Sequence, residues 1–288
     1  MSTIKRKRAR KLSNLVVSTN PKRQRLDEDN GSDSDSSLIA TGDVHTPFPM
    51  NDKGRTLHLN VKRGDVANRI LTVGDTQRAI KLSKFFDNPD HIMITHSDTT
   101  FKVFTGTFKG VPLSIVATGM GYPMMDFVVR EIRNVVKGPI AMIRLGTCGV
   151  IHEDYDAGQI LVATKGSTFI QTNHSEIIKG NAKKAYSIAD PVKADIPLSS
   201  LLVCNLRDTV GKDKVKQVMN CSADSFYCSE GRIDPNFIDL NDTLIDDLRA
   251  KFPDVVSLEM ESFALLSLAT KDMHCTAAAI GLIHQRVS

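Results

Sequence analysis

Two carboxylates stand close together in an otherwise apolar stretch near the C-terminal end of the chain. Glu259 and Glu261 are separated only by Met260 within the run of residues 255–269. Ionised side chains are costly to bury unless a partner compensates their charge. If the run begins as a strand, side chains alternate between its two faces, so the two acids share one face. The spacing therefore predicts a bound polar group or a partner at this position.

Glycines follow three strand-like apolar runs, and we interpret each glycine-bearing segment as a turn. The segments are Gly74-Asp75, Gly119-Met120-Gly121 and Gly146-Thr147-Cys148-Gly149. In α/β sheets ligands bind beyond the carboxyl ends of the strands. Glycine in such a turn lets backbone N–H groups approach an anion closely. Each turn alone is also typical of ordinary chain reversal, but the three together favour a ligand site.

Two arginines accompany these glycines. Arg78 follows Gly74 by one helical turn, and Arg144 lies inside the apolar run that precedes Gly146. A charge within such a run needs a partner. A structural ion pair would meet this need, and so would a bound anion, for which guanidinium geometry suits phosphate. We expect the anion at Arg144 and keep the ion pair as the alternative.

The segment from Asp224 to Arg232 combines aromatic and cationic side chains. Phe226 and Tyr227 are followed by a glycine and then by Arg232. An aromatic ring can stack on a flat ligand, and a guanidinium can donate hydrogen bonds to a carbonyl of that ligand. Taken alone, the segment is more typical of an edge strand and turn than of a binding site.

Strand-like and helix-like runs alternate from about residue 56 onward. The pattern predicts strands over residues 69–73, 111–117, 140–145, 159–163, 255–260 and 275–283. It predicts helices over residues 76–86, 124–136, 239–251 and from the end of the 255–260 strand to about residue 271. Such alternation is typical of an α/β sheet whose faces are covered by helices. We therefore expect one α/β domain over residues 56–288.

Residues 1–55 differ in composition from the rest of the chain. Two basic clusters, residues 5–11 and 22–25, precede an acidic and serine-rich block over residues 27–37. Charge blocks with few apolar residues cannot offset the entropy of ordering, so we expect a disordered tail. The clusters also resemble a bipartite nuclear import signal, and a plain solvated tail is the alternative.

Charge and cysteine content exclude several classes of function. Residues 1–39 carry nine Lys or Arg and five Asp or Glu, and the remaining residues carry 28 of each sign. A neutral folded domain gives no bulk electrostatic case for nucleic acid. Five scattered cysteines without a C-x-x-C pair argue against zinc sites and disulfides and favour the cytoplasm. No apolar run reaches the roughly 18 residues of a membrane span, so we expect no membrane association.

Six segments together resemble the nucleoside phosphorylase-I family, most closely its uridine-cleaving members. In chain order they are Thr56–Leu59, Val73–Arg78, Ala117–Gly121, Ile143–Gly149, Phe226–Arg232 and Leu258–Ser262. The resemblance implies a single-domain phosphorylase/hydrolase-like fold with a mixed central sheet flanked by helices. It implies phosphorolysis of a pyrimidine nucleoside, preferably uridine, to free base and ribose-1-phosphate in nucleoside salvage or catabolism. Inorganic phosphate would be the co-substrate and nucleophile, and no cofactor is implied.

The same resemblance assigns roles to individual residues. Phosphate would be bound by Gly74, Arg78, Arg144 and Thr147, ribose by His58, Met260 and Glu261, and the base by Phe226, Glu230, Arg232 and Ile283, with His284 adjacent. Arg144, Arg78 and Glu261 would be catalytic. Glu261 would accept hydrogen bonds from the ribose hydroxyls and favour the cation-like transition state. The family histidine that matches His58 reaches into a neighbouring subunit, which implies a homodimer or hexamer with shared sites.

The chain departs from the family pattern in three places. The pyrimidine enzymes usually have Gln where this chain has Glu230, and an ionised Glu cannot donate to uracil O2. A raised pKa of Glu230 would restore a donor; otherwise the base preference is shifted or the activity reduced. The phosphate arginine that a partner subunit donates is missing from residues 98–102, where Lys102 would replace its charge but not its bidentate geometry. The chain also stops at Ser288, soon after its last strand, where the family continues into a closing helix.

Two other functions stay open at this point. A purine nucleoside phosphorylase or nucleosidase would share the fold, but those members need an acid after the last strand, and this chain has none there. A non-catalytic nucleoside-binding relative in the nucleus would fit Glu230, the missing arginine and the basic tail. Release of free base that depends on phosphate separates this last alternative from the enzymes.

Overall fold

The computed structural model describes residues 48–96 and 101–284. It consists of two compact units, residues 1–49 and residues 50–288, and the helices and strands given below all belong to the second, which we call the folded unit. Residues 1–47 of the tail expected to be disordered, and the import signal within them, lie outside the described ranges. Residues 48–55 are described, and Met50 forms an isolated bridge with Thr56. Of the segment 98–102, only Phe101 and Lys102 are described. Within these ranges, no helix has the length and apolar character needed to cross a bilayer.

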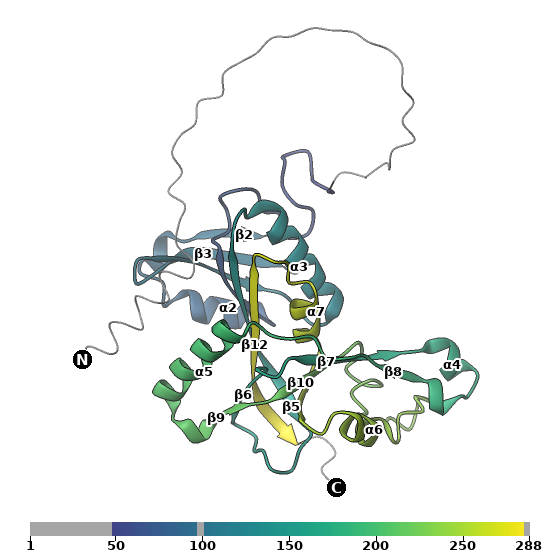
Figure 1. Ribbon diagram of the computed structural model, residues 1–288. Helices are drawn as coiled ribbons and strands as arrows, with labels where there is room; N and C mark the ends of the chain where they lie inside the picture. Colours follow the sequence, from purple (N-terminus) through teal and green to yellow (C-terminus); the bar gives the residue numbers. More distant parts are fainter. Residues whose placement is uncertain (1–47, 97–100, 285–288) are drawn as a thin grey trace, which may run out of the picture. The chain divides into compact units, whose positions relative to one another are not determined.

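A single sheet of twelve strands, counted over the described residues, runs through the centre of the folded unit (Figure 1). The strands are β1 (Arg69–Val73), β2 (Met93–His96), β3 (Lys102–Phe108), β4 (Val111–Ala117), β5 (Ile140–Val150), β6 (Ile160–Val162), β7 (Ser167–Thr172), β8 (Tyr186–Ile188), β9 (Val215–Gln217), β10 (Met219–Ala223), β11 (Val255–Glu259) and β12 (Met273–His284). Their main order is β2-β3-β4-β1-β5-β11-β10-β7-β8; β12 pairs with β5 and β6, and β6 with β9. Parallel pairs such as β1 with β5 occur beside antiparallel pairs such as β5 with β11, so the expected mixed sheet is confirmed.

Helices cover this sheet, as the α/β prediction requires. They are α2 (Thr76–Ser83), α3 (Tyr122–Val135), α4 (His174–Ile178), α5 (Ile196–Val210), α6 (Leu244–Lys251) and α7 (Ser262–Ser267), with short 3₁₀ helices η1 (Pro89–His91), η2 (Ala182–Lys184) and η3 (Lys212–Lys214). Helix α3 packs against α7, and α5 runs beside β12 and β9 (Figure 1).

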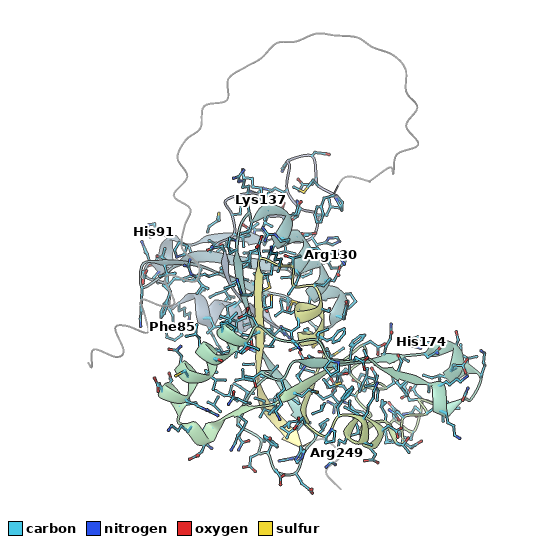
Figure 2. All side chains as sticks on the ribbon, in the orientation of Figure 1. Phe85, His91, Arg130, Lys137, His174 and Arg249 are labelled. Carbon is cyan, nitrogen blue, oxygen red and sulfur yellow. The ribbon has the colours of Figure 1, made fainter. Side chains whose placement is uncertain are left out.

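Helix α3 shows how the sequence builds such a covering element. Its apolar side chains recur three or four residues apart, and Met125, Val128 and Ile132 are fully buried in the largest core cluster. This spacing places them on one face of a helix. Arg130 lies on the exposed side of the same helix, and Lys137 lies just beyond its end (Figure 2).

Element boundaries agree best with the predictions for β1 and β4. The strands predicted over 69–73 and 111–117 match β1 and β4 residue for residue. The helix predicted over 239–251 begins only at Leu244, because Leu240 has a φ of 54°, which helical residues do not adopt. The helix predicted over 76–86 ends at Ser83. Strands β2, β3 and β7 to β10 and helices α4 and α5 had no counterpart in the sequence prediction.

Strand β5 corrects one of the three predicted turns. We expected a strand over 140–145 and a turn from Gly146 to Gly149, but β5 continues to Val150. Strand β12 pairs with it in parallel from Ile140 to Val150, which satisfies its backbone groups on that edge. Neither Gly146 nor Gly149 has a positive φ, so neither glycine reverses the chain. The predicted turns at Gly74 and at Gly119 and Gly121 do follow β1 and β4.

Candidate active site

A cavity of about 370 Å³ lies beyond the carboxyl ends of β1 and β11. It is lined by Gly74, Asp75, Arg78, Gly119, Met120, Arg144, Thr147, Cys148, Gly149, Phe226, Glu230, Arg232, Leu258, Glu259, Met260, Glu261, Leu282 and Ile283. The structure therefore brings together every residue predicted to contact phosphate, ribose or base, except His58 and His284.

The pairing of β5 explains why the cavity forms at this place. Strand β1 pairs with β5 as far as Leu145, and β11 meets β5 again at Gly149 from the opposite direction. Between these two points, Gly146, Thr147 and Cys148 pair with β12 on one edge only. The gap faces the carboxyl ends of β1 and β11 together. Such switch points are where α/β sheets bind ligands.

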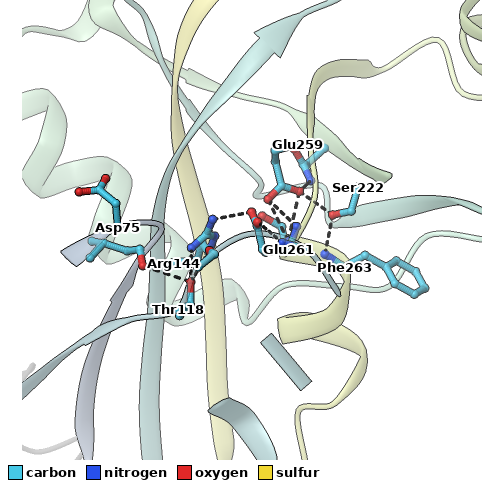
Figure 3. Close-up of polar contacts among 12 residues, drawn as sticks. Asp75, Thr118, Arg144, Ser222, Glu259, Glu261 and Phe263 are labelled. Atoms are coloured by element: carbon cyan, nitrogen blue, oxygen red, sulfur yellow. Dashed lines mark hydrogen bonds and ion pairs between the residues drawn. The ribbon is translucent and has the colours of Figure 1, made fainter. Parts of the chain in front are cut away.

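Arg144 and Glu261 form a buried ion pair in this gap (Figure 3). Arg144 Nη2 donates to Glu261 Oε2, and Arg144 Nη1 donates to Thr118 Oγ1 at 3.1 Å. The backbone N–H of Gly121 donates to Glu261 Oε1 at 2.6 Å. Arg144 is 5% exposed and Glu261 3% exposed, so each charge needs the other. The ion pair that the sequence left as an alternative for Arg144 is therefore present.

The end of the cavity next to β1 is rich in hydrogen-bond donors. The Nε of Arg144 is buried and has no partner within the described part of the chain. Asp75 caps α2 by accepting from the backbone N–H of Arg78 at 2.7 Å, and both residues line the cavity. Arg78 lines the cavity together with Gly74. Two guanidinium groups at a helix N-terminus are an arrangement suited to an anion.

Gly121 provides the backbone donor for Glu261 in a conformation that other residues avoid. Its φ of 98° and ψ of 162° lie in a region that is accessible almost only to glycine. A Cβ there would lie 3.8 Å from Met260 Cε, so space does not exclude a side chain and only the backbone does.

We expect Gly121→Ala to lower the free energy of unfolding by about 1–3 kcal/mol, because alanine must adopt this strained conformation. The measurement is denaturant unfolding of the variant beside Gly54→Ala, whose φ of 64° lies in the more accessible left-handed region and whose surroundings are open. A loss no greater than that of Gly54→Ala would mean that the backbone at Gly121 relaxes freely.

At the other end of the cavity, Glu230 and Arg232 pair with each other. Arg232 Nη2 donates to Glu230 Oε2 at 2.9 Å, and Arg232 Nε donates to the carbonyl oxygen of Phe226 at 2.9 Å. The guanidinium carbon also lies 4.0 Å from the centre of the Phe226 ring. Residues 224–232 form a loop after β10, so the edge strand that the sequence alone favoured here is wrong.

Burial shifts the acids of the cavity toward their neutral forms. It raises the pKa of Glu230 from an ordinary 4.5 to about 7, although the charge of Arg232 opposes the shift. Burial also raises the pKa of Glu261; Arg144 opposes this effect, and the nearby Glu259 adds to it. The raised pKa of Glu230 is the condition under which this side chain regains a donor. Burial raises the pKa of the Cys148 thiol as well, which keeps it protonated.

Glu259 and Glu261 do not share a strand face, so that expectation is wrong. Strand β11 ends at Glu259, and Glu261 occupies the N-cap position of α7. The chain changes direction between them, and the two carboxylates bind different partners (Figure 3).

His58 lies outside the cavity. Its Nδ1 is 2.7 Å from Oε1 of the buried Glu131, and its ring stacks on Phe127 with the ring centres 3.9 Å apart. The imidazole is about one third exposed. His284 and Lys102 likewise do not line the cavity.

Sequence reasoning missed several lining residues, including Asp75, Cys148, Leu258 and Leu282. Leu282 and Cys148 each adjoin a predicted lining residue on β12 and β5, so strand alternation would place them on the opposite face and gave no signal for them. On β12 the register against β5 shifts between Gly281 and Ile283, which interrupts that alternation. A second cavity, of about 570 Å³, lies between β8 and α6 and shares no residue with this one. Over the described residues, no group of three or more His, Cys, Asp or Glu side chains could hold a metal ion.

Comparisons with known proteins agree with this site. A uridine phosphorylase of Thermococcus kodakarensis is 29% identical over 228 residues, which cover 78% of this chain and 76% of the relative. A DeoD-type purine nucleoside phosphorylase of Oceanobacillus iheyensis is 30% identical over 222 residues, covering 75% of this chain and 81% of the relative. A structure from a study of two uridine phosphorylases of the oomycete Phytophthora capsici is 38% identical, with a TM-score of 0.78, and covers 83% of this chain and 87% of that chain.

A more distant structure shares the fold. A nucleoside phosphorylase of Trypanosoma brucei is 21% identical with a TM-score of 0.66, over 84% of this chain and 91% of that chain. The sequence model of the phosphorylase superfamily matches residues 68–284. This span includes the cavity and every strand of the sheet, and it confirms the resemblance seen in the sequence. The chain belongs to the phosphorylase superfamily.

Proposed function

We propose that the protein is a pyrimidine nucleoside phosphorylase that acts preferably on uridine. It uses inorganic phosphate to release the base and form ribose-1-phosphate. The observation that carries the proposal is the single cavity in which a donor-rich end, a buried carboxylate and an aromatic ring with a guanidinium lie together. The uridine phosphorylases among the relatives support the choice of base.

Phosphate fits the donor-rich end of the cavity. Arg144 would use its unpartnered Nε, and Arg78, Gly74 and Thr147 line the same end. A phosphate oxygen can accept from several such donors at once. Phosphate itself attacks C1′ of the ribose, so the proposal needs no cofactor.

Ribose fits beside Glu261. The hydroxyls of the sugar would donate to its carboxylate, and Met260 would pack against the ring. Cleavage of the glycosidic bond develops positive charge on the sugar, and a carboxylate held beside it stabilises that charge. The ion pair with Arg144 favours the charged form of Glu261 and opposes the rise that burial causes in the pKa of Glu261.

The base fits between Phe226, Glu230, Arg232 and Ile283. Arg232 now lies over the Phe226 ring, so the base would take that position as Arg232 turns toward a carbonyl of the base. Protonated Glu230 would donate to O2 of uracil, and ionised Glu230 would accept from N3–H.

We further propose a cytoplasmic homodimer or hexamer. The exposed edge of His58, with its Nδ1 fixed by Glu131, would contact the nucleoside of a neighbouring subunit. No disulfide joins the five cysteines, all of which lie in described ranges, which suits a reducing compartment.

The test is release of free base from uridine, deoxyuridine, thymidine, cytidine and inosine, each with and without phosphate. We expect uridine to react fastest and only with phosphate. Preference for inosine would favour the purine alternative that the Oceanobacillus iheyensis relative represents. Release without phosphate would indicate a nucleosidase, and no release from any substrate would leave the non-catalytic alternative.

A further inference from the structure

Glu259 is buried beside the cavity, and both of its carboxylate oxygens accept hydrogen bonds from protein. Oε1 accepts from Asn220 Nδ2 at 2.7 Å, from Ser222 Oγ, and from the backbone N–H of Ser262 at 3.1 Å. Oε2 accepts from the backbone N–H groups of Glu261 and Ser262, both at 3.0 Å. The side chain is therefore fully engaged by the protein, although Glu259 lines the cavity.

These contacts hold the start of α7. The first N–H groups of a helix have no partner within the helix, and the N-cap side chain commonly accepts from them. Glu261 is the N-cap residue of α7, but its side chain makes no such bond. Glu259 accepts from the N-cap and first helical residues in its place. The carboxylate of Glu261 is thereby left to bind Arg144 and Gly121.

The sheet in turn holds Glu259. Asn220 Oδ1 accepts from Ser257 Oγ at 2.7 Å, and Asn220 Nδ2 also donates to Ser167 Oγ at 2.9 Å. Ser222 Oγ accepts from the backbone N–H of Phe263 at 2.9 Å (Figure 3). Strands β7, β10 and β11 thus fix the carboxylate from one side, and α7 binds it from the other. Buried networks of this kind give a side chain one position when every group in them is satisfied.

We infer that Glu259 is a positioning residue that aims the carboxylate of Glu261 into the ribose part of the cavity. The inference rests on the proposed function, since it names how that site is held in place. Glu259 itself has no free lone pair directed at a substrate. Its effect on the reaction must therefore pass through Glu261.

The first test is Glu259→Gln, which keeps the shape of the side chain. An amide nitrogen at the Oε1 position would face the Asn220 Nδ2 donor, while the amide oxygen could still accept from the Glu261 and Ser262 N–H groups. We expect kcat/KM for the nucleoside to fall about tenfold or more, because one buried donor is left facing another.

A second substitution should restore the activity. In Glu259→Gln with Asn220→Asp, the amide and the acid exchange places, so the new amide nitrogen again meets an acceptor and the buried charge is retained. We expect most of the lost kcat/KM to return. Asp87→Asn is the matched control, because Asp87 also accepts from two backbone N–H groups, those of Lys109 and Gly110, but does not line the cavity. This control should react like the wild type.

Coupling to Glu261 separates positioning from a general loss of structure. In a Glu261→Ala background, Glu259→Gln should cost almost nothing further in kcat/KM. Additive losses would contradict the inference, because residues that act through one another are not additive. An unchanged kcat/KM for Glu259→Gln alone would overturn it as well.

A measurement without substrate keeps this inference distinct from the proposed function. Amide hydrogen exchange of residues 260–263 should speed up in Glu259→Gln. It should return to the wild-type rate in the double variant Glu259→Gln with Asn220→Asp. If the wild type releases no base from any nucleoside, the proposed function fails and this exchange still decides the role of Glu259. If Glu259→Gln leaves the amide hydrogen exchange of residues 260–263 unchanged, Glu259 does not hold the start of α7.

Discussion

Replacing Arg144 with alanine is expected to lower kcat/KM for phosphate by a factor of about 30 to several thousand. The side chain is 5% exposed and lines the cavity, and its buried Nε has no partner in the described part of the chain. A desolvated charge contact of this kind is worth about 2–5 kcal/mol, and each 1.4 kcal/mol is about tenfold in rate. The measurement is initial rate against phosphate concentration at saturating uridine.

Two variants control for effects on folding. Removal of Arg144 leaves Glu261 buried without its partner, which can cost about 3–5 kcal/mol of stability, so rates are compared well below the melting temperature. Arg144→Lys keeps the charge but cannot bind bidentately, and we expect an intermediate loss. Arg130→Ala removes an exposed arginine on α3 and should change nothing (Figure 2). If Arg144→Ala leaves the phosphate dependence as it was, phosphate binds elsewhere.

Glu230→Gln is expected to raise activity on uridine above about pH 7. In that range we expect the activity of the wild type to decline with pH and that of the variant to stay level. Burial raises the pKa of Glu230 to about 7, so below that pH the carboxyl group is protonated and donates to uracil O2. Above it, the ionised group faces O2 as an acceptor, and kcat/KM should fall about tenfold per pH unit. Glutamine donates at every pH, so kcat/KM of the Glu230→Gln variant should not decline above pH 7.

Stability provides a second readout of the same group. The folded-state pKa of about 7 exceeds the ordinary value of 4.5, so the native state holds a proton that the unfolded chain has released between these pH values. The wild type should therefore lose stability as pH rises from about 4.5 to 7, and Glu230→Gln should lose less. A variant that is no more active than the wild type at any pH would mean that Glu230 does not face O2 of the base.

The sequence predicted the parts of the fold that local pattern controls. Strands β1 and β4 are mainly apolar runs that end beside glycine-bearing turns, and their limits could be read directly. The extension of β5 through Gly146 to Val150 could not, because it depends on β12, which lies more than 120 residues later in the chain. The start of α6 depends on a positive φ at Leu240, which leucine rarely adopts, and no sequence pattern predicts that angle.

The residues of the cavity were predicted more completely than their interactions. Arg144 and Glu261 were both singled out because a charge in an apolar run needs a partner, but pairing across 117 residues of sequence depends on the tertiary fold. The pairing of Glu230 with Arg232 was equally unforeseen, although only one residue separates them. Alternation along a strand suggested that Glu259 would face the same way as Glu261, and the end of β11 at Glu259 removed that constraint.

The residues that line the cavity come from two separate stretches of the chain. One stretch runs from residue 74 to residue 149 and contains all the residues proposed to bind phosphate, and the other runs from residue 226 to residue 283. Under the proposed function, substitutions in the later stretch would change the contacts to the base and leave the residues proposed to bind phosphate unchanged. Relatives that are similarly distant from this chain carry the names of uridine and of purine phosphorylases. Under the proposed function, the choice of base would be altered at one end of a single cavity, the end at which Glu230 lies.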